Sequence, residues 1–361
     1  MKPARRAALR TMGRRGAFAW LMARGGVGKI FTGAPLGISA ASAIAASSAT
    51  PILSGCQGPG LAQGVVWQLD NAHIDPAGRW DALGVTDLMV QWSAVDGVCF
   101  VPAEGHTVPE GCQAAPRFPE WRRIATMPWA RRVLMGLAGL SSEPRARAEV
   151  STLAAQSRQL AALIQQQQRG NGGMPLAIDG WYFPVEVDPT WKQVSAMRGL
   201  LASLPRPLWI SVYDQSNIGG AALARWLASW LPDDIGVLFQ DGVGVYAREA
   251  RVARGYADAL VGHFGESRVR IIAEAFRPLP ASPTVDPHGA ASASASASAV
   301  TAAGASSAAG TASPSAPPAP LFRAATAEEL KPQLLAYQGY RVYLFDGPHY
   351  VSNQLVERLL Q

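Results

Sequence analysis

Two short apolar stretches decide the fold, and each runs into a glutamate: Leu176–Glu186, with the sequence LAIDGWYFPVE, and Val269–Glu274, with the sequence VRIIAE. Both are rich in aliphatic, β-branched and aromatic residues over a strand-like length, so each predicts a buried β-strand. We place the strands at Leu176–Phe183 and Val269–Ala273. Glu186 and Glu274 then lie just beyond the carboxyl ends of these strands.

Six further strand-like runs alternate with helical patterns along the chain. They are Gly64–Asp70, Asp87–Trp92, Arg132–Leu137, Pro207–Tyr213, Ile235–Gln240 and Arg341–Phe345. Such alternation implies parallel strands joined by right-handed crossovers. Eight units match the size of a closed (β/α)8 or TIM barrel. The alternative, a doubly wound sheet, would show a Gly-rich phosphate turn after the first strand, where this chain has Gln68-Leu69-Asp70-Asn71. The sequence therefore predicts an α/β protein with a single TIM-barrel domain over residues 57–361.

One segment interrupts this alternation after the seventh strand. Residues 281–320 consist almost wholly of Ala, Ser, Gly, Thr and Pro, with Ala-Ser repeats. Such a composition offers too little apolar surface to offset the entropy of ordering, so we expect a disordered low-complexity insertion. Its position predicts that it leaves the barrel on the face formed by the strand carboxyl ends.

The amino-terminal residues have the order of an export signal. The chain contains 32 Lys and Arg, eight of which lie within residues 1–55 where no acidic residue occurs, so 24 basic residues remain against 26 acidic ones. The basic character therefore belongs to the targeting segment, and a nucleic-acid partner is not expected. Arg14-Arg15 resembles a twin-arginine signal, and a weakly apolar stretch follows it.

The export signal is expected to end at Cys56. Leu53-Ser54-Gly55-Cys56 resembles a bacterial lipobox, in which the cysteine is lipidated and becomes the new amino terminus. This predicts a lipoprotein held to the membrane through Cys56, with residues 1–56 as the signal; an uncleaved membrane anchor is the alternative. Gln57 follows the cysteine in place of an inner-membrane retention Asp, which favours the periplasmic face of the outer membrane. In that oxidising compartment Cys99 and Cys112, close together in a Gly/Pro-containing stretch, are expected to form a disulfide.

Polar and aromatic residues gather at the predicted strand ends. In a TIM barrel the carboxyl ends of the strands form the active face. Carboxylates and amides hydrogen-bond hydroxyl groups, and aromatic faces stack on sugar rings, so this collection predicts a binding site for a polysaccharide or oligosaccharide. The predicted substrate-binding residues are Gln68, Asp70, Gln91, Trp92, Asp179, Trp181, Tyr182, Tyr213, Asp214, Gln240, Asp241 and Asp346. Any single tryptophan could equally pack between barrel and helices.

Glu186 and Glu274 are the predicted catalytic pair. Glycosidic cleavage needs one protonated carboxyl group to protonate the leaving oxygen and one ionised carboxylate to act as nucleophile or base. We assign Glu186 as acid/base and Glu274 as nucleophile, the roles that glutamates on strands four and seven have in retaining barrel glycosidases. Val185 departs from that pattern, since Asn usually precedes the acid/base glutamate there.

Three stretches resemble a known bacterial family. Val90-Gln91-Trp92, Gly180-Trp181-Tyr182 with Glu186, and Gln240-Asp241-Gly242-Val243-Gly244 resemble domain-of-unknown-function family 4434, over roughly residues 63–280. The resemblance implies a glycoside-hydrolase-like TIM barrel with a sugar-active site. The Ala/Ser insertion and the long cysteine-containing second loop are departures from the family.

Other classes of site find little support in the sequence. Gly25-Gly26-Val27-Gly28-Lys29 is an incomplete phosphate loop within the signal. The five histidines show neither H-x-x-x-H nor H-E-x-x-H spacing, so neither a metal nor a cofactor is predicted. The leading hypothesis is thus a retaining glycoside hydrolase-like lipoprotein. The alternatives are a non-catalytic polysaccharide-binding barrel in an exopolysaccharide assembly, and a structural lipoprotein with a blocked cleft.

Overall fold

The computed structural model describes residues 60–103, 108–169, 174–279 and 322–361. The predicted export signal with Cys56 and the predicted insertion at 281–320 lie outside these described residues. Within the described ranges, no helix has both the length and the apolar character needed to cross a bilayer.

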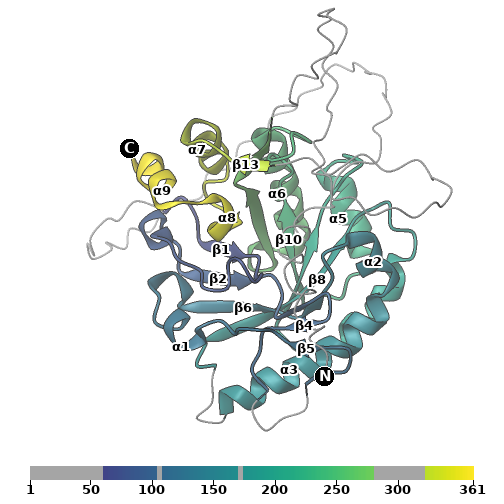
Figure 1. Ribbon diagram of the computed structural model, residues 1–361. Helices are drawn as coiled ribbons and strands as arrows, with labels where there is room; N and C mark the ends of the chain where they lie inside the picture. The colour runs from purple at the N-terminus through teal and green to yellow at the C-terminus, as the bar shows by residue number, and fades with distance from the viewer. Residues whose placement is uncertain (1–59, 104–107, 170–173, 280–321) are drawn as a thin grey trace, which may run out of the picture.

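Eight parallel strands close into a barrel, which confirms the predicted TIM-barrel fold (Figure 1). Around the barrel the order is β1-β14-β11-β10-β9-β8-β6-β2, and β2 pairs again with β1. The strands are β1 (Gly64–Trp67), β2 (Asp87–Val90), β6 (Arg132–Gly136), β8 (Ile178–Val187), β9 (Leu208–Val212), β10 (Ile235–Gln240), β11 (Val269–Glu274) and β14 (Val342–Phe345). Each predicted strand is present, and the two that decide the fold extend to include Glu186 and Glu274.

Helices and short 3-10 turns surround the barrel. The α-helices are α1 (Trp121–Ile124), α2 (Glu143–Ala148), α3 (Val150–Arg169), α4 (Met197–Ala202), α5 (Gly220–Ala228), α6 (Ala250–Phe264), α7 (Ala327–Ala336), α8 (Gly347–Tyr350) and α9 (Asn353–Leu360). The 3-10 turns are η1 (Trp80–Leu83), η2 (Pro128–Ala130), η3 (Val194–Ala196) and η4 (Glu266–Arg268). Helix α7 begins with a capping box, in which Thr326 and Glu329 satisfy each other's backbone N–H groups. Between β1 and β2 the chain forms only the single turn η1.

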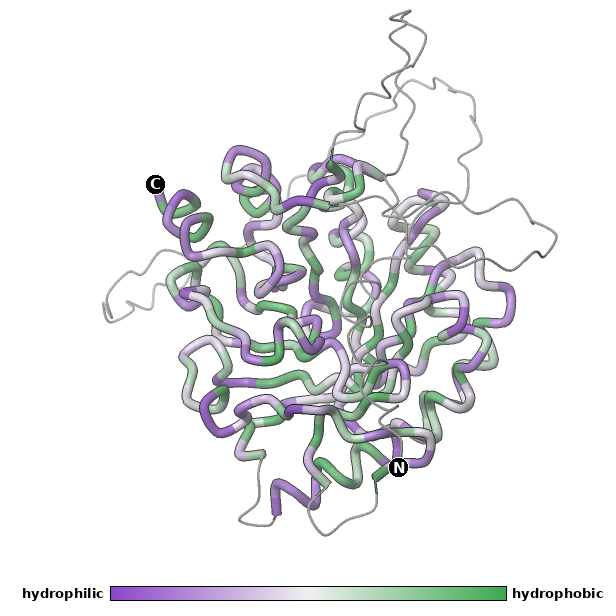
Figure 2. The backbone as a smooth tube through the Cα atoms, viewed as in Figure 1, coloured by the Kyte–Doolittle hydropathy of each residue, from purple (hydrophilic) through white to green (hydrophobic). Residues whose placement is uncertain are grey.

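The core has two layers because side chains alternate along each strand. The inner layer takes one side chain from each barrel strand: Val66, Met89, Leu134, Tyr182, Trp209, Leu238, Ile272 and Tyr343. The residues between them, such as Trp67 and Trp181, point outward and pack under the helices. Figure 2 shows hydrophobic residues concentrated along the barrel strands, while the peripheral helices and loops carry most of the hydrophilic residues.

A small sheet covers part of the carboxyl end of the barrel. Its strands are β3 (Ala94–Val95), β4 (Val98–Cys99), β5 (Gln113–Ala114) and β7 (Ala138–Gly139), in the order β5-β4-β3-β7. The predicted disulfide between Cys99 and Cys112 is confirmed, and it fastens β4 beside β5. The sheet therefore holds the segment after β7 against the mouth of the barrel.

A second pair of strands brackets the predicted insertion. β12 (Phe276–Pro278) and β13 (Phe322–Ala324) pair antiparallel, with Phe276 opposite Ala324. The described chain therefore stops at Leu279 and resumes at Phe322 beside the carboxyl end of β11. The same pairing brings Phe276 and Phe322 into edge-to-face contact, with ring centroids 4.7 Å apart.

Candidate active site

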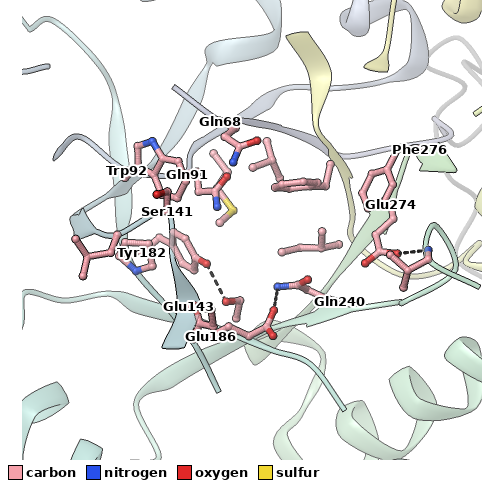
Figure 3. A pocket seen from close by; sticks show the side chains of 18 of the residues that line it. Gln68, Gln91, Trp92, Ser141, Glu143, Tyr182, Glu186, Gln240, Glu274 and Phe276 are labelled. Atoms are coloured by element: carbon pink, nitrogen blue, oxygen red, sulfur yellow. Dashed lines mark hydrogen bonds between the residues drawn. The ribbon is translucent and has the colours of Figure 1, made fainter. Parts of the chain in front are cut away.

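A pocket opens at the carboxyl ends of the barrel strands (Figure 3). The empty space between its lining residues, including the opening to solvent, is about 860 Å³. The wall is mixed. Its polar side chains are Gln68, Gln91, Ser141, Glu143, Tyr182, Glu186, Ser211, Gln240 and Glu274, and its aromatic ones include Trp92, Phe276, Phe322 and Phe345.

Both predicted catalytic glutamates line this pocket. On β8 the alternate residues Tyr182, Pro184 and Glu186 face it, and on β11 Ile272 and Glu274 do the same. Period-two alternation thus carries the interior layer of the barrel directly into the pocket wall. Glu186 lies beyond a register irregularity between β8 and β9 that falls after Phe183. In the view of Figure 3 the two carboxyl groups lie on different sides of the pocket floor.

Different partners orient the two carboxyl groups. Gln240 donates its amide N–H to Glu186 Oε2. The backbone N–H of Val245 donates to Glu274 Oε2 at 3.2 Å. Each side chain is therefore held in one position by a neighbouring strand or loop.

Glu143, which the sequence analysis missed, is a third carboxyl group in the pocket wall. It is the first residue of α2, directly after the small strand β7, and its Oε1 accepts a 3.1 Å hydrogen bond from Arg147 Nε. The backbone N–H of Glu186 also donates to the Glu143 carboxylate. Extending the search for polar strand ends past the third barrel strand would have found it.

Burial changes the protonation of all three groups. Glu143, Glu186 and Glu274 are exposed by only 8%, 3% and 4%. Burial raises the pKa of Glu143 to about 7, against the opposing charge of Arg147. It raises the pKa of Glu274 to about 8, and the nearby Asp241 charge adds to this. Burial and the Glu143 charge raise the pKa of Glu186 well above its ordinary value. The pocket therefore holds protonated carboxyl groups at neutral pH, because buried carboxyl groups that lie close together do not ionise simultaneously.

Two glutamines in the pocket wall have amide oxygens without a hydrogen-bond partner among the described residues. Gln68 Oε1 and Gln91 Oε1 are buried and accept no hydrogen bond from the described residues. Trp92 lies beside them, fixed by its 2.7 Å hydrogen bond from Nε1 to the Leu69 carbonyl. Since unsatisfied buried acceptors cost free energy, these amides favour a ligand that carries hydroxyl or N–H donors.

Of the predicted substrate-binding residues, Gln68, Gln91, Trp92, Tyr182 and Gln240 line the pocket. Two others were placed wrongly at the mouth. Asp179 is the second residue of the ten-residue strand β8, so it is exposed at the opposite end of the barrel. Trp181 follows the period of two to the outside of the barrel and packs in the layer under the helices.

Three more predicted residues lie outside the pocket wall. Asp214 is fully buried and accepts a 2.7 Å hydrogen bond from the Tyr256 hydroxyl. Asp241, also fully buried, accepts hydrogen bonds from the Glu274 backbone N–H and the Tyr337 hydroxyl, so it supports Glu274 from outside the pocket. Tyr213 is buried, with the Arg248 guanidinium over its ring. These three residues are therefore not part of the pocket wall, and their contact with substrate stays a prediction.

Asp70 and Asp346 occupy the loops that follow β1 and β14. Asp346 is fully buried, and its Oδ2 accepts a 3.2 Å hydrogen bond from the backbone N–H of Gln68. Both carboxylates contact His349 rather than the pocket. Burial alone would lower the pKa of His349, but hydrogen bonds to Asp346 and Asp70 raise it to about 9. Asp346 thus positions the pocket residue Gln68 indirectly.

Comparisons with known proteins give only a distant likeness. No protein-family model matches the chain, and no curated protein matches it in sequence. A solved structure described as a "putative alpha-L-fucosidase" from Bacteroides thetaiotaomicron VPI-5482 is similar over 88% of this chain and 96% of that chain, with a TM-score of 0.47 and 15% identity. A likeness of this degree carries no argument about chemistry. The resemblance to family 4434 stays a prediction.

Proposed function

We propose that this protein is an exported glycoside hydrolase-like lipoprotein that binds a polysaccharide or oligosaccharide in the barrel pocket and cleaves a glycosidic bond. One observation carries the proposal: Glu186 and Glu274 reach one pocket from β8 and β11, and both carboxyl groups are buried. Glycosidic cleavage uses two carboxyl groups in opposite protonation states. Burial of the kind found here is how proteins keep one of them protonated at neutral pH.

The surroundings of the two glutamates favour different roles. Glu186 is the proton donor, because burial and the adjacent Glu143 charge hold its proton. Glu274 is the nucleophile, because the backbone N–H groups of Val245 and Gly244 stabilise its ionised form. With a pKa of about 8, about a tenth of Glu274 is ionised at pH 7.

In the first step the Glu274 carboxylate forms a bond to the anomeric carbon while the bond to the leaving oxygen breaks. The proton of Glu186 goes to that oxygen, so the aglycone departs as an alcohol. In the second step a water molecule attacks the anomeric carbon, Glu186 accepts a proton from the water, and Glu274 is released as carboxylate. The product keeps the anomeric configuration of the substrate.

The rest of the pocket suits a sugar. The side-chain amides of Gln68 and Gln91 line the pocket, and amides exchange hydrogen bonds with hydroxyl groups. The Trp92 ring offers a flat apolar surface next to them, on which the C–H face of a pyranose can stack.

The experiment is a screen of the full chain against a panel of polysaccharides, with release of reducing ends as the readout. Wild-type protein is expected to cleave at least one polymer. Glu186→Gln should lower kcat about a thousandfold or more. The exposed Glu266→Gln serves as the matched control and should leave the rate unchanged. A polymer that binds tightly to wild-type protein without any release of reducing ends would contradict hydrolysis and support the non-catalytic polysaccharide-binding barrel.

The cellular location forms a separate part of the proposal. The lipobox-like sequence ending in Cys56 supports a lipid anchor, and Gln57 supports the outer membrane. The Cys99–Cys112 disulfide fits an oxidising compartment. Cys56→Ser should move the protein from the membrane fraction to the soluble fraction. Retention of the variant in the membrane would rule out anchoring through this cysteine.

A further inference from the structure

A cluster of two histidines and a carboxylate lies beside the pocket, outside its wall. Asp70 and His73 belong to the loop after β1, and His349 belongs to α8, which follows β14. Since β1 and β14 are paired neighbours in the barrel, their loops leave the same edge and converge. One ligand atom from each of the three residues can be chosen so that all lie within 4.8 Å of one another.

Both imidazoles approach the Asp70 carboxylate, each at a different oxygen. His73 Nδ1 lies 3.3 Å from Asp70 Oδ1, and His349 Nε2 lies 3.4 Å from Asp70 Oδ2. Ligand atoms in a tetrahedral zinc site are about 3.3–3.4 Å apart, so the three chosen atoms, which lie within 4.8 Å of one another, move closer together when an ion binds. Asp70 Oδ1 already accepts the backbone N–H groups of Ala72 and His73. Asp70 Oδ2 is therefore the oxygen directed at the ion, on the side of His349.

The second nitrogen of His349 has the partner that metal-bound histidines use. Nδ1 lies 2.7 and 2.9 Å from the two oxygens of the fully buried Asp346. A carboxylate on one imidazole nitrogen fixes the ring and directs the other nitrogen at the metal. This arrangement leaves Nε2 of His349 facing Asp70, where a metal ion would replace the proton that the two groups otherwise share.

The charges and contacts in the cluster also favour a cation. The rings of His73 and His349 touch, with centroids 3.8 Å apart, so two protonated imidazoles would repel at this distance. Asp70 and Asp346 bring two carboxylates to the imidazole pair, a charge that matches a divalent cation. The side chains of His73 and Asp70 are 36% and 42% exposed, so an ion can reach them from solvent.

We propose that Asp70, His73 and His349 bind one zinc ion that fastens the loop after β1 to α8. Two imidazoles and a carboxylate suit zinc among the common divalent ions, and water completes the tetrahedron. Asp346 links this ion to the pocket, because it also accepts the backbone N–H of Gln68. The ion stabilises one side of the pocket wall, and the assignment stands whether or not the pocket cleaves a sugar.

The test measures zinc binding by the full chain without any carbohydrate. The protein is stripped with a chelator, titrated with zinc by calorimetry, and checked for bound metal by mass spectrometry. We expect each chain to bind one zinc ion. At free zinc a hundredfold above the Kd, the midpoint of thermal unfolding should rise by about 5 °C.

Single variants decide whether the ion sits in this cluster. His73→Ala and Asp70→Asn should weaken binding by about tenfold or more and reduce the thermal shift. His263→Ala, at an exposed position of α6, is the matched control and should bind as wild type. Absence of zinc binding, or binding that is equal in His73→Ala and His263→Ala, would overturn the assignment. Failure of carbohydrate cleavage would leave it standing, because no readout depends on activity.

Discussion

Replacing Glu274 by Gln should flatten the pH dependence of folding stability. Folded Glu274 keeps its proton up to about pH 8, because burial and the Asp241 charge raise its pKa from the ordinary value of 4.5. In the unfolded chain the same group loses its proton near pH 4.5. Unfolding therefore releases a proton between these two values, and the free energy of unfolding falls as the pH rises through this window. Gln is close in shape and does not titrate.

The size of the effect follows from the two pKa values. One proton released on unfolding changes stability by about 1.4 kcal/mol per pH unit. Integrated between pH 5 and pH 7, the contribution of Glu274 is a loss of about 2.5 kcal/mol. Glu143 and Glu186 add to the loss with the same sign, because burial raises their pKa values too. The unfolding free energy of the wild-type protein should therefore fall more steeply with pH than the release of one proton would give.

Urea unfolding at pH 5 and pH 7 measures this difference. The drop in unfolding free energy between the two pH values should be about 2.5 kcal/mol smaller for Glu274→Gln than for wild type. Glu266→Gln alters an exposed carboxyl and should keep the wild-type drop. Equal drops for wild type and Glu274→Gln would refute the claim that the folded pocket holds this carboxyl protonated.

Three further predictions concern activity and stability. For a polymer that the protein cleaves, kcat/KM should rise with pH between about 7 and 8 as the nucleophile Glu274 ionises, and a profile that falls across this range would reverse the assigned roles. Glu143→Gln should move the alkaline limb of the same profile to lower pH, because the Glu143 charge helps to raise the pKa of Glu186; an unmoved limb would show that the two groups do not interact. Cys112→Ser should lower the free energy of unfolding by about 3 kcal/mol, since the disulfide closes a loop of sequence separation 13, and a calorimetric midpoint equal to that of wild type would contradict this.

The barrel was predictable because its signal is repeated and local. Every strand is an apolar run of suitable length, and the alternation with helices leaves few topologies. Glu186 and Glu274 were predictable for the same reason, since the carboxyl ends of parallel strands meet at one face. The two strands that flank the predicted insertion, β12 and β13, also follow β11 at that face.

The errors in the site came from strand boundaries and from burial. Asp179 was assigned to the wrong end because β8 starts later and ends later than its apolar run indicates. Trp181 was misassigned because its side of the strand depends on register, which an almost continuous apolar run does not mark. Asp214 and Asp241 look like substrate-binding carboxylates in the sequence, yet tertiary hydrogen bonds bury them behind the pocket wall.

The residues that were missed depend on contacts between distant segments. Glu143 enters the pocket only because the small sheet directs the chain after β7 over the mouth of the barrel. His73 and His349 lie near opposite ends of the described chain and meet through the pairing of β1 with β14. A search for short histidine spacings cannot detect such a pair.

Covalent trapping tests the central claim most directly. A 2-deoxy-2-fluoro glycoside of the sugar that the protein cleaves slows the second step of retaining hydrolysis, so the sugar stays attached to the nucleophile. Peptide mapping of the trapped protein should place the added mass on Glu274. Two results would contradict the assignment of Glu274 as the nucleophile of this pocket, both in a protein that cleaves the parent sugar. One is an adduct on another residue, and the other is release of the leaving group from the fluoro glycoside without any adduct.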